Sequence, residues 1–62
     1  MKIKWQLKWQ LWCYYETEDK WKLEGFFDSL ILARTHLEGL RKDVDTPCMP
    51  DFEYVRVEVS VP

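Results

Sequence analysis

The chain contains few of the residues from which catalytic and metal sites are built. Among its 62 residues there are only two cysteines and one histidine. Cys13, His36 and Cys48 lie far apart in the sequence and lack the closely spaced pairs that are typical of zinc sites. His36 lies at the flank of an apolar helical stripe, where packing is a commoner role than general-base catalysis. We therefore predict no catalytic residue, no metal site and no cofactor, and a protein that is not an enzyme.

Long apolar runs are also missing from the sequence. No stretch resembles the continuous apolar region of a secretory signal, and none approaches the ~20 residues of a membrane span. We therefore expect a cytoplasmic protein that does not insert into a membrane. Thiols are reduced in that compartment, so Cys13 and Cys48 are expected to be free. In an oxidising compartment they would be the only intrachain pair.

The composition is that of one small folded domain spanning residues 1–62. Hydrophobic residues make up 47% of the chain and aromatic residues 16%, with four tryptophans. Disordered chains are poor in aromatic residues, so this composition indicates a packed core. The formal net charge is −2, which provides no general attraction to the phosphates of a nucleic acid.

Strict alternation dominates the first part of the chain. The odd positions from Ile3 to Leu11 are apolar, and the even positions between them are Lys or Gln. This period-two pattern predicts a strand over residues 3–15. Polar residues 16–19 predict a turn. Alternation resumes over residues 20–28, so the two segments form a β-hairpin.

The second half of the chain predicts a helix followed by a third strand. Residues 28–42 have helical periodicity, with Asp28 or Ser29 as the N-cap. A proline-containing loop follows, and residues 52–61 alternate again as a strand. The apolar stripe of the helix consists of Leu30, Ala33, Leu37 and Leu40.

The order of these elements predicts an α+β fold of the β-β-α-β type. The first strand is longer than the second strand can cover, so it is placed in the centre. We expect a three-stranded antiparallel sheet in the order 2-1-3, with the helix packed on one face.

The hairpin register follows from the alternation. A regular ladder places Glu16 opposite Lys20. In this register Trp12 faces Glu24. The predicted helix-covered face then contains Trp5, Leu7, Trp9, Leu11, Trp21, Leu23, Phe27 and the four valines of the last strand.

The opposite face of the sheet has no second helix to cover it. Trp12 breaks the alternation of the first strand by placing a bulky aromatic residue on that face. Aromatic and arginine side chains are enriched at interface hot spots, so we predict a partner-binding surface there. The predicted partner-binding residues are Trp12, Tyr14, Lys22, Glu24, Phe26, Tyr54, Arg56 and Glu58.

Two other interpretations of this face remain open. In the first, the aromatic side chains only stabilise the sheet by packing against one another. In the second, they stack the bases of single-stranded nucleic acid, as in RRM domains. The RNP1 pattern is absent and the net charge has the wrong sign, which disfavours nucleic acid as a partner.

The last strand is expected to lie at an edge of the sheet. Arg56 and Glu58 are its only interior charges, so it carries few of the features that normally protect edges. Two such edges could pair across a twofold axis. The sequence therefore also suggests a homodimer through the C-terminal edge strand.

Two segments, "WCYYETEDKWKLEGFF" and "FEYVRVEV", give the region from Trp12 to Val61 a family resemblance. It resembles the small bacteriophage proteins that inhibit bacterial RNA polymerase, which have a hairpin, one helix and a last strand. In that family an arginine pair on the last strand and an acidic surface engage the polymerase. Arg56 matches the first arginine, whereas Glu58 occupies the position of the second and reverses its charge.

This resemblance implies a non-enzymatic, phage-encoded inhibitor that acts in the cytoplasm of the host cell. Its partner would be a host protein, either bacterial RNA polymerase or a CRISPR or other defence nuclease. Inhibitors of those nucleases belong to the same class of small phage proteins but share no common motif.

Overall fold

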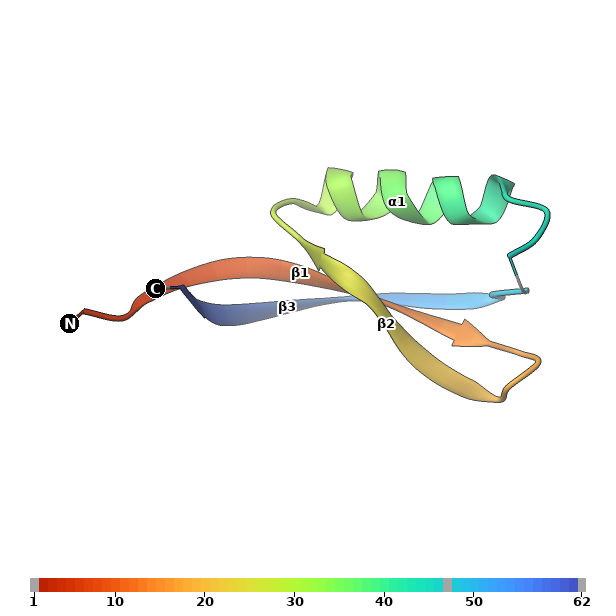
Figure 1. Cartoon of the computed structure of the whole chain (residues 1–62), viewed down its shortest axis with the longest axis horizontal. Helices are drawn as coiled ribbons and strands as arrows, with labels where there is room; N and C mark the ends of the chain where they lie inside the picture. Colours follow the sequence, from red (N-terminus) through yellow and green to blue (C-terminus); the bar gives the residue numbers. More distant parts are fainter. Residues whose placement is uncertain (1, 47, 62) are drawn as a thin grey trace.

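The computed structural model describes residues 2–46 and 48–61. Four elements follow one another: β1 (Lys4–Tyr15), β2 (Lys20–Phe27), α1 (Leu30–Lys42) and β3 (Asp51–Val61). The strands form an antiparallel sheet in the order β2-β1-β3, and α1 lies over one face of it (Figure 1). The predicted α+β fold and strand order are confirmed.

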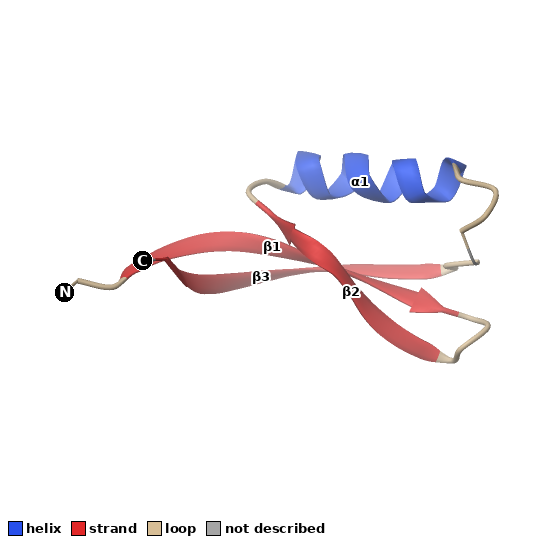
Figure 2. Ribbon diagram, viewed as in Figure 1, coloured by secondary structure: helices blue, strands red, loops and turns tan. Residues whose placement is uncertain are grey.

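The sheet is three-stranded along only part of its length. β2 pairs with residues 9–15 of β1, whereas β3 pairs with residues 4–14. Residues 4–8 of β1 and 57–61 of β3 therefore form a two-stranded segment, which we call the ribbon. Figure 2 shows the ribbon extending beyond α1.

The ribbon makes the molecule elongated. The radius of gyration is 13.6 Å, whereas about 10.6 Å is typical of a compact domain of this length. The accessible surface is 4950 Å², compared with about 4300 Å² for a typical monomer of this mass. The folded chain therefore exposes more surface than a compact domain of its size.

Capping side chains define the start of α1. The Ser29 hydroxyl accepts a hydrogen bond from the Leu32 backbone N–H at 3.3 Å, so Ser29 is the N-cap. Asp28, the other predicted candidate, instead forms an ion pair with Lys8 of β1. That ion pair connects the entry to the helix with the central strand.

The hydrophobic core lies between α1 and the three-stranded part of the sheet. Leu11 and Cys13 project from β1 against α1, and both are fully buried. The buried hydrophobic residues are Leu11, Cys13, Ala33, Leu37 and Met49. Met49 comes from the loop after α1, and the sequence pattern did not predict its place in the core. Tyr15, Phe27, Leu40 and Tyr54 pack around this cluster.

A β-bulge interrupts the pairing of β1 with β2. Gly25 lies opposite Leu11, as a regular ladder requires, but the next pair is Trp12 with Leu23. Glu24 is therefore an extra residue on β2, and the predicted pairing of Trp12 with Glu24 is wrong.

The bulge changes which side chains of β2 face α1. Trp21 lies opposite Tyr14 and Leu23 lies opposite Trp12, on the face away from the helix. Their exposed fractions are 45% and 39%, so their predicted place in the core is wrong. Lys22 turns to the helix side instead. A shift of one residue has this effect because successive side chains of a strand point to opposite faces.

The faces of β3 are also opposite to the prediction. Tyr54 pairs with Leu11 and therefore shares the helix side with it, whereas Val57 pairs with Lys8 on the open side. The predicted faces are therefore wrong for the four valines and for Tyr54, Arg56 and Glu58.

The position of α1 explains this arrangement. The part of β3 beside the buried core is its first half, where Phe52 and Tyr54 have side chains long enough to reach the helix. Val57 and the valines after it belong to the ribbon, which α1 does not cover. Their alternation therefore reflects strand geometry and not burial in the core.

Within the described part of the chain, no helix has the length and apolarity that crossing a membrane requires.

Candidate functional site

Apolar side chains gather on the face of the sheet that α1 leaves open. Those of β1 and β2 lie on this face because of the bulge, and Val55 of β3 joins them opposite Gln10. We call this surface the open-face patch. It consists of Trp12, Tyr14, Trp21, Leu23, Phe26 and Val55.

A hollow lies within the patch. Trp12, Trp21, Glu53 and Val55 line it, and its volume is about 270 Å³. Small-molecule sites usually enclose about 300–1000 Å³, so this hollow lies just below that range. Its size and apolar walls fit one inserted side chain of a protein partner better than a whole small molecule.

Contacts within the chain fix the aromatic side chains of the patch. The Trp12 indole Nε1–H donates a hydrogen bond to Gln10 Oε1 at 2.9 Å. The rings of Tyr14 and Trp21 lie 5.7 Å apart between centroids and are tilted at 55°. Side chains held in this way lose little conformational entropy when a partner binds.

Acidic residues flank the open-face patch on β3 and in the turn after β1. Glu53 lies opposite Trp12, and Asp51 lies opposite Tyr14. The Tyr14 hydroxyl donates a hydrogen bond to the Asp19 carboxylate, which raises the pKa of Tyr14 above its usual value. The patch therefore combines an apolar centre with a negatively charged margin.

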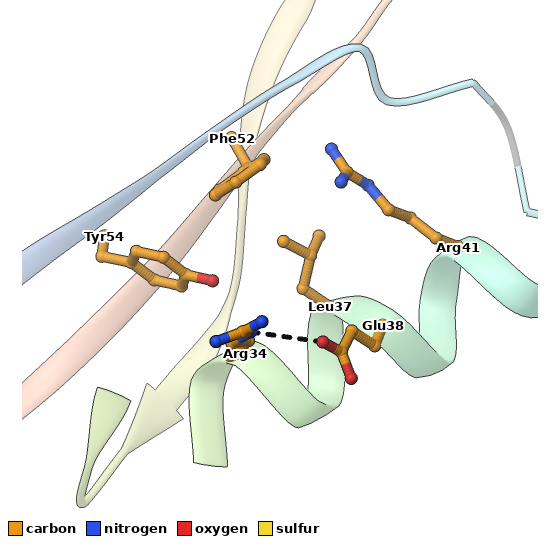
Figure 3. A pocket seen from close by; sticks show the side chains of 6 residues that line it. All are labelled: Arg34, Leu37, Glu38, Arg41, Phe52 and Tyr54. Atoms are coloured by element: carbon orange, nitrogen blue, oxygen red, sulfur yellow. Dashed lines mark hydrogen bonds and ion pairs between the residues drawn. The ribbon is translucent and has the colours of Figure 1, made fainter. Parts of the chain in front are cut away.

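A second hollow lies on the other face, between α1 and β3. Figure 3 shows the rings of Phe52 and Tyr54 on the sheet side and Leu37 on the helix side. The Arg41 guanidinium lies 4.7 Å from the centre of the Phe52 ring, and the rings of Phe52 and Tyr54 lie 5.4 Å apart. These contacts lie at the edge of the packed core.

Arg34 lies at the other end of that hollow. Its Nε donates a hydrogen bond to Glu38 Oε1 at 3.2 Å, one helical turn further along α1. Both side chains are exposed, and such pairs contribute only about 0.3–0.5 kcal/mol. We interpret this hollow as the boundary of the packed core.

The structure brings together only part of the predicted partner-binding set. Trp12, Tyr14 and Phe26 lie together on the open face, as predicted. Tyr54 packs against the core on the helix side. Glu58 is also on that side, opposite Leu7 of the ribbon.

The remaining members of the predicted set have intramolecular partners on the helix side. The Lys22 ammonium lies 4.8 Å from the centre of the Tyr15 ring, and Glu24 accepts a hydrogen bond from the Tyr15 hydroxyl. The Arg56 guanidinium lies 5.6 Å from the centre of the Trp9 ring. These side chains do not belong to the open-face patch.

Sequence analysis missed Trp21, Leu23 and Val55 as members of the patch. The two residues of β2 were assigned to the core because their alternation matches that of Phe27. The only local signal for a bulge is Gly25, since a glycine inside a strand often marks one. For Val55 no such signal exists, because both sets of alternate residues in β3 contain apolar side chains.

Neither cysteine is activated as a nucleophile. Burial, together with the nearby Glu24 carboxylate, raises the pKa of Cys13 to about 11. Cys48 is exposed, and a hydrogen bond to Glu16 raises its pKa above the usual value. Both thiols therefore stay protonated at neutral pH.

The histidine has a packing contact. The His36 ring lies 5.2 Å from that of Phe27 between centroids. Within residues 2–46 and 48–61, no three His, Cys, Asp or Glu side chains form a group suited to a metal ion.

No family model matches the chain, and comparison with curated proteins and with solved structures finds no significant match.

Proposed function

We propose that the chain is a non-enzymatic protein that binds another protein through the open-face patch. The observation that carries this proposal is the hollow between Trp12 and Trp21, which has apolar walls and an acidic residue at its margin. Aromatic side chains that are half-exposed but held by their neighbours are typical of interface hot spots. The acidic margin favours a partner whose surface offers an apolar side chain beside basic residues.

The resemblance to phage inhibitors of RNA polymerase suggests the kind of partner. On this proposal the chain is a phage-encoded inhibitor that binds a host machine in the host cytoplasm, either RNA polymerase or a defence nuclease. Arg56, the residue that carries part of the resemblance, lies on the helix side. The proposed contact through the open face therefore does not depend on that arginine.

The acidic margin argues against single-stranded nucleic acid as the ligand of this patch. Phosphates would approach Glu53 and Asp51, which lie opposite the aromatic residues of β1. The open-face lysines Lys4 and Lys8 lie on the ribbon, away from the hollow. Binding of a short oligonucleotide that weakens steeply with salt would favour this alternative.

The test uses purified bacterial RNA polymerase as the first probe and the immobilised chain as bait. The expected result is binding that Trp12→Ala weakens about 30-fold or more, as expected for a hot-spot residue. Trp5→Ala is the matched control, because Trp5 is an exposed tryptophan of the same strand on the other face. Its affinity should be unchanged.

If the polymerase does not bind, the same three baits are compared in a bacterial lysate. A protein captured by the wild-type chain and by Trp5→Ala, but not by Trp12→Ala, supports binding through the patch. A protein that is captured by Trp12→Ala but not by Trp5→Ala contradicts binding through the patch. Circular dichroism of each variant confirms that the bait is folded.

A further inference from the structure

The outer edge of β3 is the longest edge of the sheet. β3 runs from Asp51 to Val61, and its only neighbour in the strand order is β1. Its other side carries backbone N–H and C=O groups that no strand of the described chain pairs. Natural edge strands are normally protected by charged side chains, above all lysine, by proline or by a bulge. Residues 51–61 contain neither lysine nor proline, and their pairing with β1 is regular.

Over residues 55–59 the charged and the apolar side chains of this edge point to opposite faces of the sheet. Arg56 and Glu58 point to the helix side, and Val55, Val57 and Val59 point to the open side. Within residues 2–46 and 48–61, neither Arg56 nor Glu58 forms an ion pair.

We propose that two copies of the chain form a homodimer by pairing their β3 edges in antiparallel fashion, with a twofold axis at Val57. In this arrangement Arg56 lies opposite Glu58 of the partner subunit, and Glu58 lies opposite Arg56 of the partner subunit. Two opposite-charge pairs therefore form on the helix side. On the open side, the valines of both copies make one continuous apolar stripe.

The charges select this register. Arg56 meets the partner's Glu58 only when the axis lies at Val57. An axis at Arg56 would place the two arginines opposite each other, and an axis at Glu58 would do the same with the two glutamates. Like charges directly opposite each other destabilise strand pairs. A shift that exchanges the faces would set the valines of one copy against the charges of the other.

The resulting dimer contains one six-stranded sheet. The paired segments run over residues 53–61, about 30 Å of strand. Both helices lie on the same face but near opposite ends of the sheet, since α1 lies beside the first half of β3 in each copy. Pairing through the ribbon would also bury part of the surface that makes the monomer unusually extended.

The proposal does not rest on the function proposed above, although the two surfaces share two residues of β3. The interface uses the backbone edge of β3, whereas Trp12 and Trp21 lie on β1 and β2. Val55 and Glu53 of β3 belong to both surfaces, since they also line the hollow. A dimer would therefore present two copies of the open-face patch. If no partner binds the patch, the homodimer proposal still stands. If the chain does not dimerise, the partner-binding proposal still stands.

Charge reversal tests the pairing, with sedimentation velocity measuring the mass across a range of concentrations. Arg56→Glu and Glu58→Arg should each weaken the dimer about tenfold or more, because each places like charges opposite one another. A mixture of the two variants should recover the dimer. When one copy carries Arg56→Glu and the other Glu58→Arg, positions 56 and 58 again bring opposite charges together in both pairs. Recovery in the mixture also shows that both variants are folded.

Disulfide trapping tests the register in a Cys48→Ser background, which removes the exposed native thiol. Val57→Cys should cross-link to its own copy under mild oxidation, because the two positions meet at the axis. Val59→Cys is the matched control and should not cross-link, since its two copies lie about 13 Å apart along the strands.

Three results would overturn the proposal. The first is a wild-type chain that remains monomeric at every concentration. The second is a dimer that both charge reversals leave unchanged, because another surface would then hold it. The third is efficient cross-linking of Val59→Cys without cross-linking of Val57→Cys, because the register would then be wrong.

Discussion

The two halves of β1 share one sequence pattern and have different environments. In the first half, the ribbon, Leu7 is 50% exposed; in the second half, under α1, Leu11 is fully buried. Both leucines lie on the same face of the same strand, and both are flanked by polar or aromatic residues. Alternation therefore indicates a strand and its two faces, whereas burial depends on which part of the strand α1 covers.

The same comparison separates the hydrophobic core from the exposed end of the sheet. The buried residues lie in the helix-covered half or in its loop, and the described ribbon contributes none of them. The ribbon instead exposes apolar side chains and a free strand edge, which together are the features of an interaction surface. We expect the covered half to supply most of the free energy of unfolding, and the ribbon to supply part of the proposed contact with a second copy of the chain.

Matched leucine truncations give the largest expected difference between the halves. Leu11→Ala removes a fully buried side chain and should lower the free energy of unfolding by about 2–5 kcal/mol. Leu7→Ala should lower it by less than about 1 kcal/mol, because that side chain remains half exposed to water. Urea denaturation at a fixed low protein concentration measures both. Equal losses would contradict the division into a core half and a ribbon.

Alkaline pH should act on the covered half alone. The pKa of Cys13 is raised from 9.0 to about 11, and that of Tyr15 from 10.0 to about 12, where a hydrogen bond to Glu24 is the main cause. The unfolded chain, having the lower pKa values, releases these protons first as the pH rises. Stability should therefore be constant below about pH 9 and should fall between about pH 9 and 12.

The measurement is the denaturant midpoint as a function of pH, in the presence of a reducing agent. Tyr15→Phe is the control, because it removes the raised pKa of Tyr15 and leaves that of Cys13. Its midpoint should fall less steeply than that of the wild type above pH 10. A wild-type midpoint that does not change up to pH 11 would show that the two groups are not protected in the folded chain.

The sequence predicted the elements and their order because these depend on periodicity. Alternation over residues 3–15 and the helical stripe from Leu30 to Leu40 are long enough to be unambiguous. Ser29 was one of two predicted N-caps, and the capping hydrogen bond identifies it. The prediction of a central first strand rested on its length, which also determines where the ribbon begins.

Face assignment could not be predicted equally well. A single extra residue, Glu24, reverses the faces of the outer half of β2, and the apolar residues on both sides of it fit either register. In β3 the choice lay between valines and aromatic residues, both of which are common in cores. That choice depends on the length of α1 relative to the sheet, which the pattern of β3 alone does not contain. The predicted site was consequently divided between the two faces.

The smallest expected effect lies at the boundary between the halves, where the Arg56 guanidinium rests 5.6 Å from the centre of the Trp9 ring. A double-mutant cycle of Arg56→Gln and Trp9→Leu should give a coupling of about 0.5–1 kcal/mol in the free energy of unfolding, as expected for an exposed cation–π contact. Arg34→Gln combined with Trp9→Leu is the control and should give no coupling, since the Arg34 side chain pairs with Glu38 on α1. The cycle is measured at low concentration, so that the edge of β3 is unpaired and Arg56 reports only on its own chain. A coupling near zero would mean that Arg56 leaves the Trp9 ring in solution. The ribbon would then be independent of the covered half, and Arg56 would have no preformed position from which to meet a partner's carboxylate.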